Sequence, residues 1–330
     1  MKQFDFVIVG SGFGGSVSAL RLAEKGYSVA VIEMGKRWKA DDYPKTNWVL
    51  HKFLWAPALS FYGFFRMTLL KDVFVLSGAG VGGGSLVYAN TLPVPKDEAW
   101  DDPVWHGLAE WKDVMPPFYA TAQQMLGVTR YPHHTKADEI VLDYAKKIGT
   151  EDTFVQAPVG VWFGEPGKTV DDPYFDGKGP SRTGCIQCGG CMVGCRHNAK
   201  NSLDKNYLYL AEKLGVTVIE ETLVTRIQPQ IEGGYTLHVE RSTSKFIKNR
   251  RTIHADQVVL SGGVLGTVPL LMNSRDSGDL SNLSPQLGNY VRTNNEAIVG
   301  VSFRGEVDMT DGIAITSKVA LDDNTHLEPC

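Results

Sequence analysis

Four cysteines of the 330-residue sequence lie in one short stretch, at Cys185, Cys188, Cys191 and Cys195. Their spacing, C-x2-C-x2-C-x3-C, is that of a bacterial ferredoxin run, whose thiolates hold an iron–sulfur cluster. The residue after the run is Arg196 rather than the ferredoxin proline, and zinc sites usually separate two cysteine pairs by a longer loop. A 4Fe–4S cluster on these cysteines is therefore one hypothesis, beside zinc and structural or redox-active thiols.

A glycine motif near the N-terminus has the spacing that binds the phosphates of a dinucleotide. Gly10, Gly12 and Gly15 form G-x-G-x-x-G directly after the apolar run 5–9. Gly10 permits the turn, Gly12 lets the backbone approach a pyrophosphate, and Gly15 lets a helix pack against the strand. The N–H groups that begin this helix attract the phosphates. Glu33 follows at the distance expected of an acid that binds a ribose hydroxyl.

The elements that must position this motif alternate between strands and a helix. We expect buried strands at 5–9 and 29–32, because both are short apolar runs, and a helix at 16–25 between them. A later apolar run at 258–260 leads to Gly262, which indicates a strand that returns to the same sheet. The pattern predicts an α/β fold with an FAD/NAD(P)-binding Rossmann-like lobe.

A second glycine cluster favours FAD over NAD as the dinucleotide. It comprises Gly78, Gly80 and the run Gly82, Gly83 and Gly84, with Ser85 after it. A cofactor with two nucleotides and a bulky isoalloxazine needs a second close approach of the backbone. An acid in the ribose position disfavours the 2′-phosphate of NADP.

Taken in order, these glycine sites resemble those of the glucose–methanol–choline (GMC) oxidoreductases, and within them the cholesterol-oxidase-like branch. Segments 78–90 (GAGVGGGSLVYAN), 200–218 (KNSLDKNYLYLAEKLGVTV) and 261–288 carry the resemblance. It implies an FAD-binding lobe on a parallel sheet. It also implies a second, mostly antiparallel substrate or cap lobe that covers the flavin.

The resemblance implies further FAD contacts. Val224 matches the position whose backbone meets the adenine, and Asn90 stands next to where branch members carry an Asn–Gly pair near the flavin. No histidine lies between residues 78 and 95, where some members attach FAD covalently, so non-covalent FAD is implied. The residues expected to bind FAD are Gly10, Ser11, Gly12, Phe13, Gly14, Gly15, Glu33, Gly82, Gly83, Gly84, Ser85, Asn90, Val224 and Gly262.

The domains are expected to interleave along the chain. The FAD-binding domain is expected over 1–100 and 185–290, and an incomplete substrate or cap region over 101–184 and 291–330. Family members are longer and carry a catalytic histidine with an Asn or His partner near the C-terminus. We therefore expect this chain to lack that C-terminal part, and the catalytic residue stays unassigned. Four histidines are the candidate substitutes, and spacing favours none of them: His106, His133, His134 and His326.

By the resemblance, the protein oxidises the CH–OH group of a hydrophobic alcohol, with a sterol as the leading substrate. A base takes the hydroxyl proton, and hydride passes to flavin N5. Oxygen or an electron carrier is then the acceptor. Three alternatives stay open: an FAD/iron–sulfur dehydrogenase that passes electrons to a carrier, a non-catalytic FAD-binding module, and a NAD-dependent reductase, which would need a second dinucleotide fingerprint.

Composition restricts the partners and the compartment. The net charge of −4 argues against nucleic acid, because phosphate binding needs a concentrated basic face. The apolar, aromatic run 53–65 is shorter than the roughly 20 residues that span a bilayer. It is either a buried segment or an apolar doorway for a lipophilic substrate, with peripheral membrane contact. The start of the sequence shows no signal-peptide pattern, so a cytoplasmic protein is expected.

Overall fold

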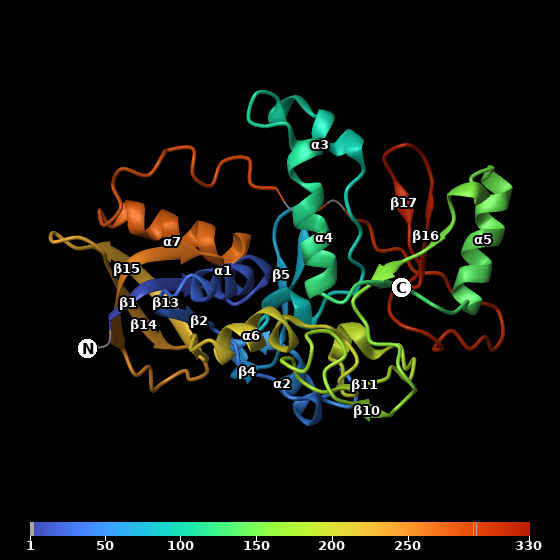
Figure 1. The fold of residues 1–330 in the computed structure, drawn as a ribbon, viewed down its shortest axis with the longest axis horizontal. Coiled ribbons are helices and arrows are strands. Elements are labelled where there is room, and N and C mark those ends of the chain that lie inside the picture. Colours follow the sequence, from blue (N-terminus) through green and yellow to red (C-terminus); the bar gives the residue numbers. More distant parts are fainter. Residues whose placement is uncertain (1–2, 293, 295) are drawn as a thin grey trace. The chain divides into compact units, whose positions relative to one another are not determined.

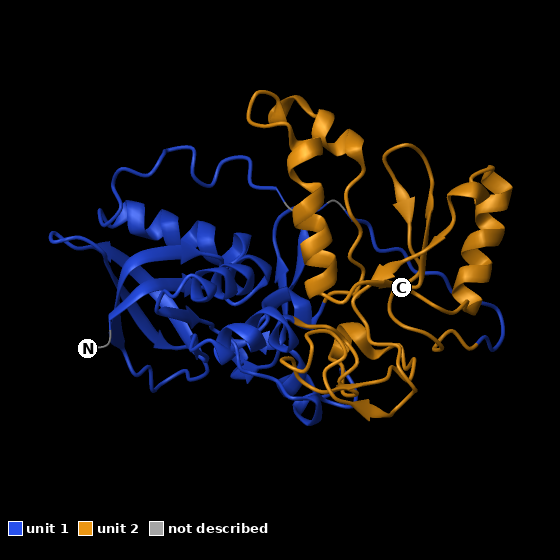
Figure 2. Cartoon of the chain, viewed as in Figure 1, with its two compact units in different colours: residues 1–87, 203–307 blue, residues 88–202, 308–330 orange. Residues whose placement is uncertain are grey.

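The structure is a computed structural model that describes residues 3–292, 294 and 296–330, and it divides into two compact units (Figures 1 and 2). Unit 1 comprises residues 1–87 and 203–307, and unit 2 comprises residues 88–202 and 308–330. The two units interleave along the chain, and their bounds differ from those expected for the two domains. The cysteine run, expected in the FAD-binding domain, lies in unit 2 because it packs with residues 157–161 and 313–315 of that unit.

Unit 1 is built on a six-stranded sheet whose first four strands run parallel and whose last two are antiparallel. The parallel part is buried, as expected of short apolar runs, and the antiparallel hairpin extends it at one edge. In spatial order the strands are β12 (Thr217–Ile219), β2 (Val29–Ile32), β1 (Gln3–Val9), β15 (Arg251–Leu260), β14 (Tyr235–Arg241) and β13 (Thr222–Pro229).

Three helices of unit 1 pack on this framework. Helix α1 (Phe13–Glu24) follows β1 after the glycine turn and contacts β2 and α6 (Tyr207–Lys213). Helix α7 (Val264–Asp276) follows β15 and contacts β13, and its Leu270 belongs to the sheet's hydrophobic core. The ends of β1 and β15 therefore each lead into a helix at the same edge of the sheet, where α/β folds bind ligands.

The apolar run 53–65 in unit 1 is buried near its two ends and exposed at residues 57–60. Phe53, Phe64 and Phe65 are each less than 8% exposed and contact one another through their rings. These three rings thus pack in a core, whereas Leu59 in the middle of the run is 67% exposed. A role of the run as an apolar doorway stays a prediction. The segment contains the end of helix α2 (Leu50–Phe53) and the short pair β3 (Trp55–Ala56) and β4 (Phe61–Tyr62), and it leads into the hairpin β5 (Phe65–Leu69) and β6 (Phe74–Gly78).

Unit 2 has short antiparallel strand pairs and three helices. The strand groups are β7 (Thr129–Arg130) with β9 (Pro158–Val159), β10 (Thr169–Val170) with β11 (Arg182–Thr183), and β8 (Val155–Gln156) with β16 (Ser317–Ala320) and β17 (His326–Leu327). The helices are α3 (Trp111–Val114), α4 (Pro116–Met125) and α5 (Lys136–Ile148). The predicted fold class, a Rossmann-like lobe with a mostly antiparallel second lobe, is confirmed. Among the described helices, none has the length and apolar character needed to cross a membrane.

Candidate functional site

The glycine turn after β1 is closely packed at two of its three glycines and open at the third. Gly10 has φ +98° and donates its N–H to Ile32 O at 2.8 Å, and a Cβ there would lie 2.4 Å from Ser261 O. A Cβ on Gly15 would lie 2.0 Å from Gly10 O. At Gly12, by contrast, no described atom lies within 4 Å of the Cβ position. The turn therefore needs glycine at its ends for packing, and it leaves space beside Gly12 for a ligand.

The first turn of α1 faces this space with its backbone donors. Gly12 is the N-cap residue, and no side chain among the described residues caps this end of the helix. The first turn also contains no acidic residue. A helix of this length, uncapped at its N-terminus and beginning at an open glycine, attracts an anion such as a pyrophosphate.

Glu33 lies at the end of β2 and is hydrogen-bonded to the glycine turn. Its Oε2 accepts from the N–H and the hydroxyl of Ser11, at 3.1 and 2.6 Å, and its Oε1 accepts from Gly35 N at 2.9 Å. The side chain is only 5% exposed, and this burial raises the pKa of the Glu33 carboxyl, opposed by those hydrogen bonds. The acid expected to bind a ribose is thus held rigidly next to the phosphate turn.

The second glycine cluster lies directly against the first. A Cβ on Gly83 would lie 2.7 Å from the Cα of Gly12, so the two backbones touch. Gly82 N donates to the Ser11 hydroxyl at 3.0 Å. The Ser85 hydroxyl donates to Gly82 O at 2.7 Å and accepts from Leu203 N at 3.0 Å, which holds the loop. Two segments about 70 residues apart therefore form one backbone surface.

Two further predicted FAD contacts, Gly262 and Val224, lie in unit 1. Gly262 follows Ser261, whose N–H donates to Val9 O at 2.8 Å, so it lies beside the end of β1. Val224 lies on the edge strand β13, and its side chain is buried in the core of the sheet. The start of β13 reaches the acid, since Thr222 N donates to Glu33 O at 2.9 Å.

Asn90, the remaining predicted contact, belongs to unit 2. It has φ +69° and is fully buried. Neither its amide nitrogen nor its amide oxygen forms a hydrogen bond to a described residue. Burial raises the pKa of the Cys191 thiol, and the nearby Asn90 amide is among the groups that oppose this rise. Its role at the flavin stays a prediction.

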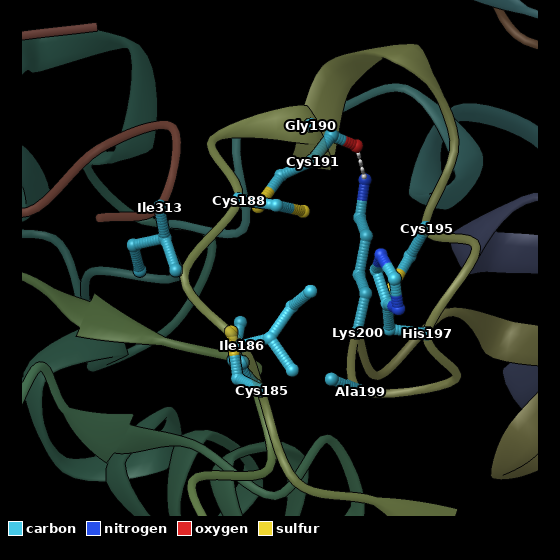
Figure 3. Close-up of a pocket in the computed structure, with 11 residues that line it drawn as sticks. Cys185, Ile186, Cys188, Gly190, Cys191, Cys195, His197, Ala199, Lys200 and Ile313 are labelled. Carbon is cyan, nitrogen blue, oxygen red and sulfur yellow. Dashed lines mark hydrogen bonds between the residues drawn. The ribbon is translucent and has the colours of Figure 1, made fainter. Parts of the chain in front are cut away.

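The four cysteines of the run line one small pocket of unit 2, together with His197 and Lys200 (Figure 3). The cavity measures about 20 Å³, the space of a single water molecule. No group of three or more His, Cys, Asp or Glu side chains in the described part of the chain is arranged to hold a metal ion. The iron–sulfur and zinc hypotheses for Cys185, Cys188, Cys191 and Cys195 are therefore not supported.

A buried lysine lies beside the thiols of the cysteine run. The Lys200 ammonium donates to Cys191 O at 2.9 Å and to Tyr88 O at 2.6 Å, and it lies 4.5 Å from the centre of the Tyr88 ring. Burial raises the pKa of the Cys185 thiol to about 12 and also raises the pKa of Cys191. A buried cation thus lies beside Cys191, and ferredoxin spacing alone does not establish a cluster site.

Sequence reasoning missed two buried cations beside the cysteine run. Lys200 is 2% exposed and Arg182 is 1% exposed. The Arg182 guanidinium donates to the carbonyl oxygens of Ala199 and Lys200, at 2.8 and 2.9 Å, and so holds the segment that carries the lysine. Nothing in the sequence distinguishes these residues from solvated ones. The four candidate histidines, His106, His133, His134 and His326, are all exposed in unit 2.

Comparisons with known proteins extend these observations. A family profile described as "GMC oxidoreductase" matches residues 180–286, and one described as "NAD(P)-binding Rossmann-like domain" matches residues 8–49. The chain is 48% identical to a cholesterol oxidase of Acinetobacter baumannii, over 99% of this chain and 60% of the relative. It is 49% identical to a cholesterol oxidase of Mycobacterium tuberculosis, over 99% of this chain and 58% of the relative. The chain thus spans about 60% of the length of these curated relatives.

More distant proteins share the same region. A long-chain-alcohol oxidase of Arabidopsis thaliana is 26% identical over 97% of this chain and 41% of its own length. Among solved structures, an FAD-dependent oxidoreductase from Chaetomium thermophilum superposes with a TM-score of 0.55 at 16% identity, covering 82% of this chain and 47% of that one. At this identity the structural likeness shows the fold alone.

Proposed function

Because the chain belongs to the GMC oxidoreductase family, we propose that it binds FAD non-covalently and serves the oxidation of a hydrophobic alcohol, with sterols as the leading substrate class. The printed names of its relatives, cholesterol oxidases and a long-chain-alcohol oxidase, support this substrate class. The observation that carries the proposal is the open space at Gly12, bounded by the second glycine loop and the start of α1.

The residues of unit 1 fit the parts of FAD one by one. The open backbone at Gly12 and the uncapped start of α1 would hold the pyrophosphate. The Glu33 carboxylate would accept from a ribose hydroxyl, with Ser11 and Gly35 fixing its orientation. The edge strand at Val224 would lie along the adenine. When bound, the flavin supplies a hydride acceptor at N5, with oxygen or an electron carrier as the final acceptor.

Removal of the hydroxyl proton needs a base, and none of the described residues is assigned that role. The four candidate histidines are exposed. Three of them have a polar partner at a ring nitrogen, His106 with Asp101 O, His134 with Gln156 and His326 with Glu328, so such contacts do not distinguish one as the base. The part of the reaction proposed for this chain is therefore to bind and orient the cofactor. An experiment with an alcohol substrate distinguishes a chain that only binds FAD from one that also oxidises the alcohol.

The test is reconstitution of the purified chain with FAD, followed by anaerobic addition of a sterol or a long-chain alcohol. Flavin absorbance that stays with the protein through gel filtration supports the binding proposal, and bleaching by alcohol supports catalysis. Flavin that binds without bleaching favours the non-catalytic module. Iron and acid-labile sulfide, assayed on the same sample, test the FAD/iron–sulfur dehydrogenase. A chain that takes up no FAD contradicts the proposal.

A single substitution tests the place of binding. Gly12→Val fills the open space with a side chain that the extended backbone at Gly12, φ −69° and ψ −165°, accepts. We expect an apo protein with unchanged thermal unfolding that no longer retains FAD. The matched control is Gly300→Val, the same substitution at an exposed glycine of unit 1 whose Cβ position also meets nothing within 4 Å and which is not among the predicted FAD contacts. If Gly12→Val binds FAD as well as the control does, the pyrophosphate lies elsewhere.

The hairpin β5–β6, which follows the aromatic run 53–65, is the segment proposed to contact a membrane surface. The β5–β6 hairpin exposes Met67, Leu69 and Phe74 by 49%, 80% and 54%. Clustered exposed apolar side chains next to a basic residue such as Lys71 suit the surface of a bilayer that holds a sterol. The double variant Leu69→Ser with Phe74→Ser should lose co-sedimentation with phosphatidylcholine–sterol vesicles and keep its thermal unfolding. Equal binding by wild type and variant would exclude this contact.

A further inference from the structure

The cysteine run contains a C-x-x-C pair, Cys188-Gly-Gly-Cys191, that the cofactor site does not use. This spacing is the one found in thiol–disulfide oxidoreductases. The two cysteines differ in accessibility, since Cys188 is exposed and Cys191 is buried. An exposed thiol beside a buried one is the arrangement of an attacked and a resolving cysteine.

The backbone brings the two thiols to one end of the pocket. Gly189, at φ +64°, turns the chain, and its N–H donates to Gly312 O at 3.0 Å, which anchors the turn. The Cys188 sulfur folds back over the turn, 3.6 Å from the Cβ position of Gly190. Figure 3 shows Cys188 and Cys191 together below Gly190.

The other two cysteines of the run are placed differently. Figure 3 shows Cys185 at the opposite end of the pocket and Cys195 on the side of His197. The Cys185 sulfur also accepts a hydrogen bond from Gln187 N at 3.3 Å. All the cysteines carry thiols rather than disulfides in this structure. Cys188 and Cys191 are thus the pair that combines C-x-x-C spacing, a shared end of the pocket and unequal exposure.

We propose that Cys188 and Cys191 form a redox-active dithiol that a peroxide converts reversibly to a disulfide. The Cys188 thiolate attacks one peroxide oxygen, the O–O bond breaks, and hydroxide leaves as water, which yields a sulfenic acid at Cys188. The Cys191 sulfur then attacks that sulfur, the S–O bond breaks, and a second water leaves with the Cys191 proton. Two thiols are oxidised by two electrons, and one hydrogen peroxide is reduced to two waters. A small thiol reductant reverses the reaction.

The surroundings of Cys191 suit a resolving thiol. The Lys200 ammonium and the buried Asn90 amide both lie close enough to favour its thiolate, against the burial that disfavours it. Lys200 also donates to the Cys191 carbonyl, which ties the dithiol turn to Tyr88 through the second Lys200 hydrogen bond. Oxidation of the pair would thus change the position of Lys200 and its hydrogen bond to Tyr88, the first residue of unit 2. The proposal does not depend on bound flavin, because peroxide can be supplied as a reagent.

The test maps thiols in the full chain after titration with hydrogen peroxide. Thiols that remain are blocked with iodoacetamide, the disulfides are reduced, and the released thiols are labelled with N-ethylmaleimide. Trypsin then yields the peptide 183–196, which contains all four cysteines of the run, so fragment ions assign each label. We expect maleimide on Cys188 and Cys191 alone. Labels on a different pair, or only sulfinic and sulfonic acids, overturn the proposal.

Variants supply an independent readout. Cys188→Ser, at an exposed position, should fold normally and lose the disulfide, while the matched control Cys330→Ser should form it as the wild type does. Cys191→Ser should leave a sulfenic acid on Cys188 that dimedone labels. If Cys191→Ser fails to fold, the thiol map of the wild type and the Cys188→Ser variant still show whether the Cys188–Cys191 disulfide forms. Disulfide formation that survives in Cys188→Ser, or stoichiometric iron and sulfide in the purified chain, contradicts the dithiol.

Discussion

The glycine turn Gly10–Gly15 of unit 1 and the cysteine loop Cys185–Cys195 of unit 2 are both short and glycine-rich, yet glycine serves different ends in them. In the turn, a Cβ on Gly15 would overlap backbone at 2.0 Å. In the loop, a Cβ on Gly190 would make ordinary contact with the Cys188 sulfur at 3.6 Å. The turn is thus specified by close backbone packing, whereas the loop uses glycine to reverse direction around thiols. A spacing motif is reliable where packing enforces it.

The largest effect that this comparison predicts is at Gly15. Gly15→Ala places a methyl group against the backbone of Gly10, which cannot yield as a side chain would, so α1 must move off β1. We expect a loss of about 3 kcal/mol in the free energy of unfolding, measured by urea titration. The control Gly14→Ala, on the same helix, should be neutral or stabilise by up to about 1 kcal/mol, because alanine favours the helix. Equal stability of the two variants would show that the turn is not constrained by packing.

The next effect concerns the buried Lys200 beside the cysteine loop. Lys200→Met keeps the length of the side chain and leaves the carbonyls of Tyr88 and Cys191 without their donor. We expect a loss of about 2 kcal/mol in the free energy of unfolding, because buried carbonyls without a partner are costly. Lys168→Met, at an exposed ion pair with Glu165, should leave stability unchanged in the same urea titration. An unchanged free energy of unfolding in Lys200→Met would mean that the cysteine loop is stable without the hydrogen bonds of the lysine.

A smaller effect depends on pH and on Glu33. Burial raises the pKa of this carboxyl above its usual 4.5, so the unfolded chain releases the proton at a lower pH than the folded protein does. The contribution of Glu33 to stability is therefore fully present below pH 4.5 and is lost as the pH rises through the folded pKa. Glu33→Gln does not titrate, so its deficit relative to the wild type should shrink as the pH rises from acid to neutral. Urea titrations of both proteins across this range provide the measurement, and a constant difference would contradict the assignment.

The smallest effect is expected in the cysteine loop. Gly190→Ala should change the free energy of unfolding by no more than about 0.5 kcal/mol, because its Cβ makes an ordinary contact. Gly189→Ala should cost about 1 kcal/mol, because Gly189 has a left-handed φ of +64°. Thermal unfolding of the two variants, side by side, checks the ranking. A large loss at Gly190 would remove the difference between the two glycine-rich segments.

The local patterns of unit 1 were predictable from the sequence. The apolar run 29–32 is β2, the run 5–9 lies within β1, and the helix expected at 16–25 overlaps α1 (Phe13–Glu24). These predictions hold because each element is short and its consecutive or periodic apolar residues indicate which side chains are buried. The G-x-G-x-x-G spacing belongs to the same class, since its glycines lie within one strand, turn and helix of consecutive residues.

What the sequence by itself determined is therefore the Rossmann-like start, the second glycine cluster and the family resemblance, all carried by residues close together in the chain. The tertiary structure alone decided which distant segments meet: Gly83 against Gly12, and Lys200 against the Cys191 carbonyl. It also decided that the four cysteines line one small cavity of about 20 Å³ beside a buried lysine. The physical reason is that metal binding and burial depend on the atoms that pack around a side chain. The spacing of cysteines along the sequence does not specify those atoms.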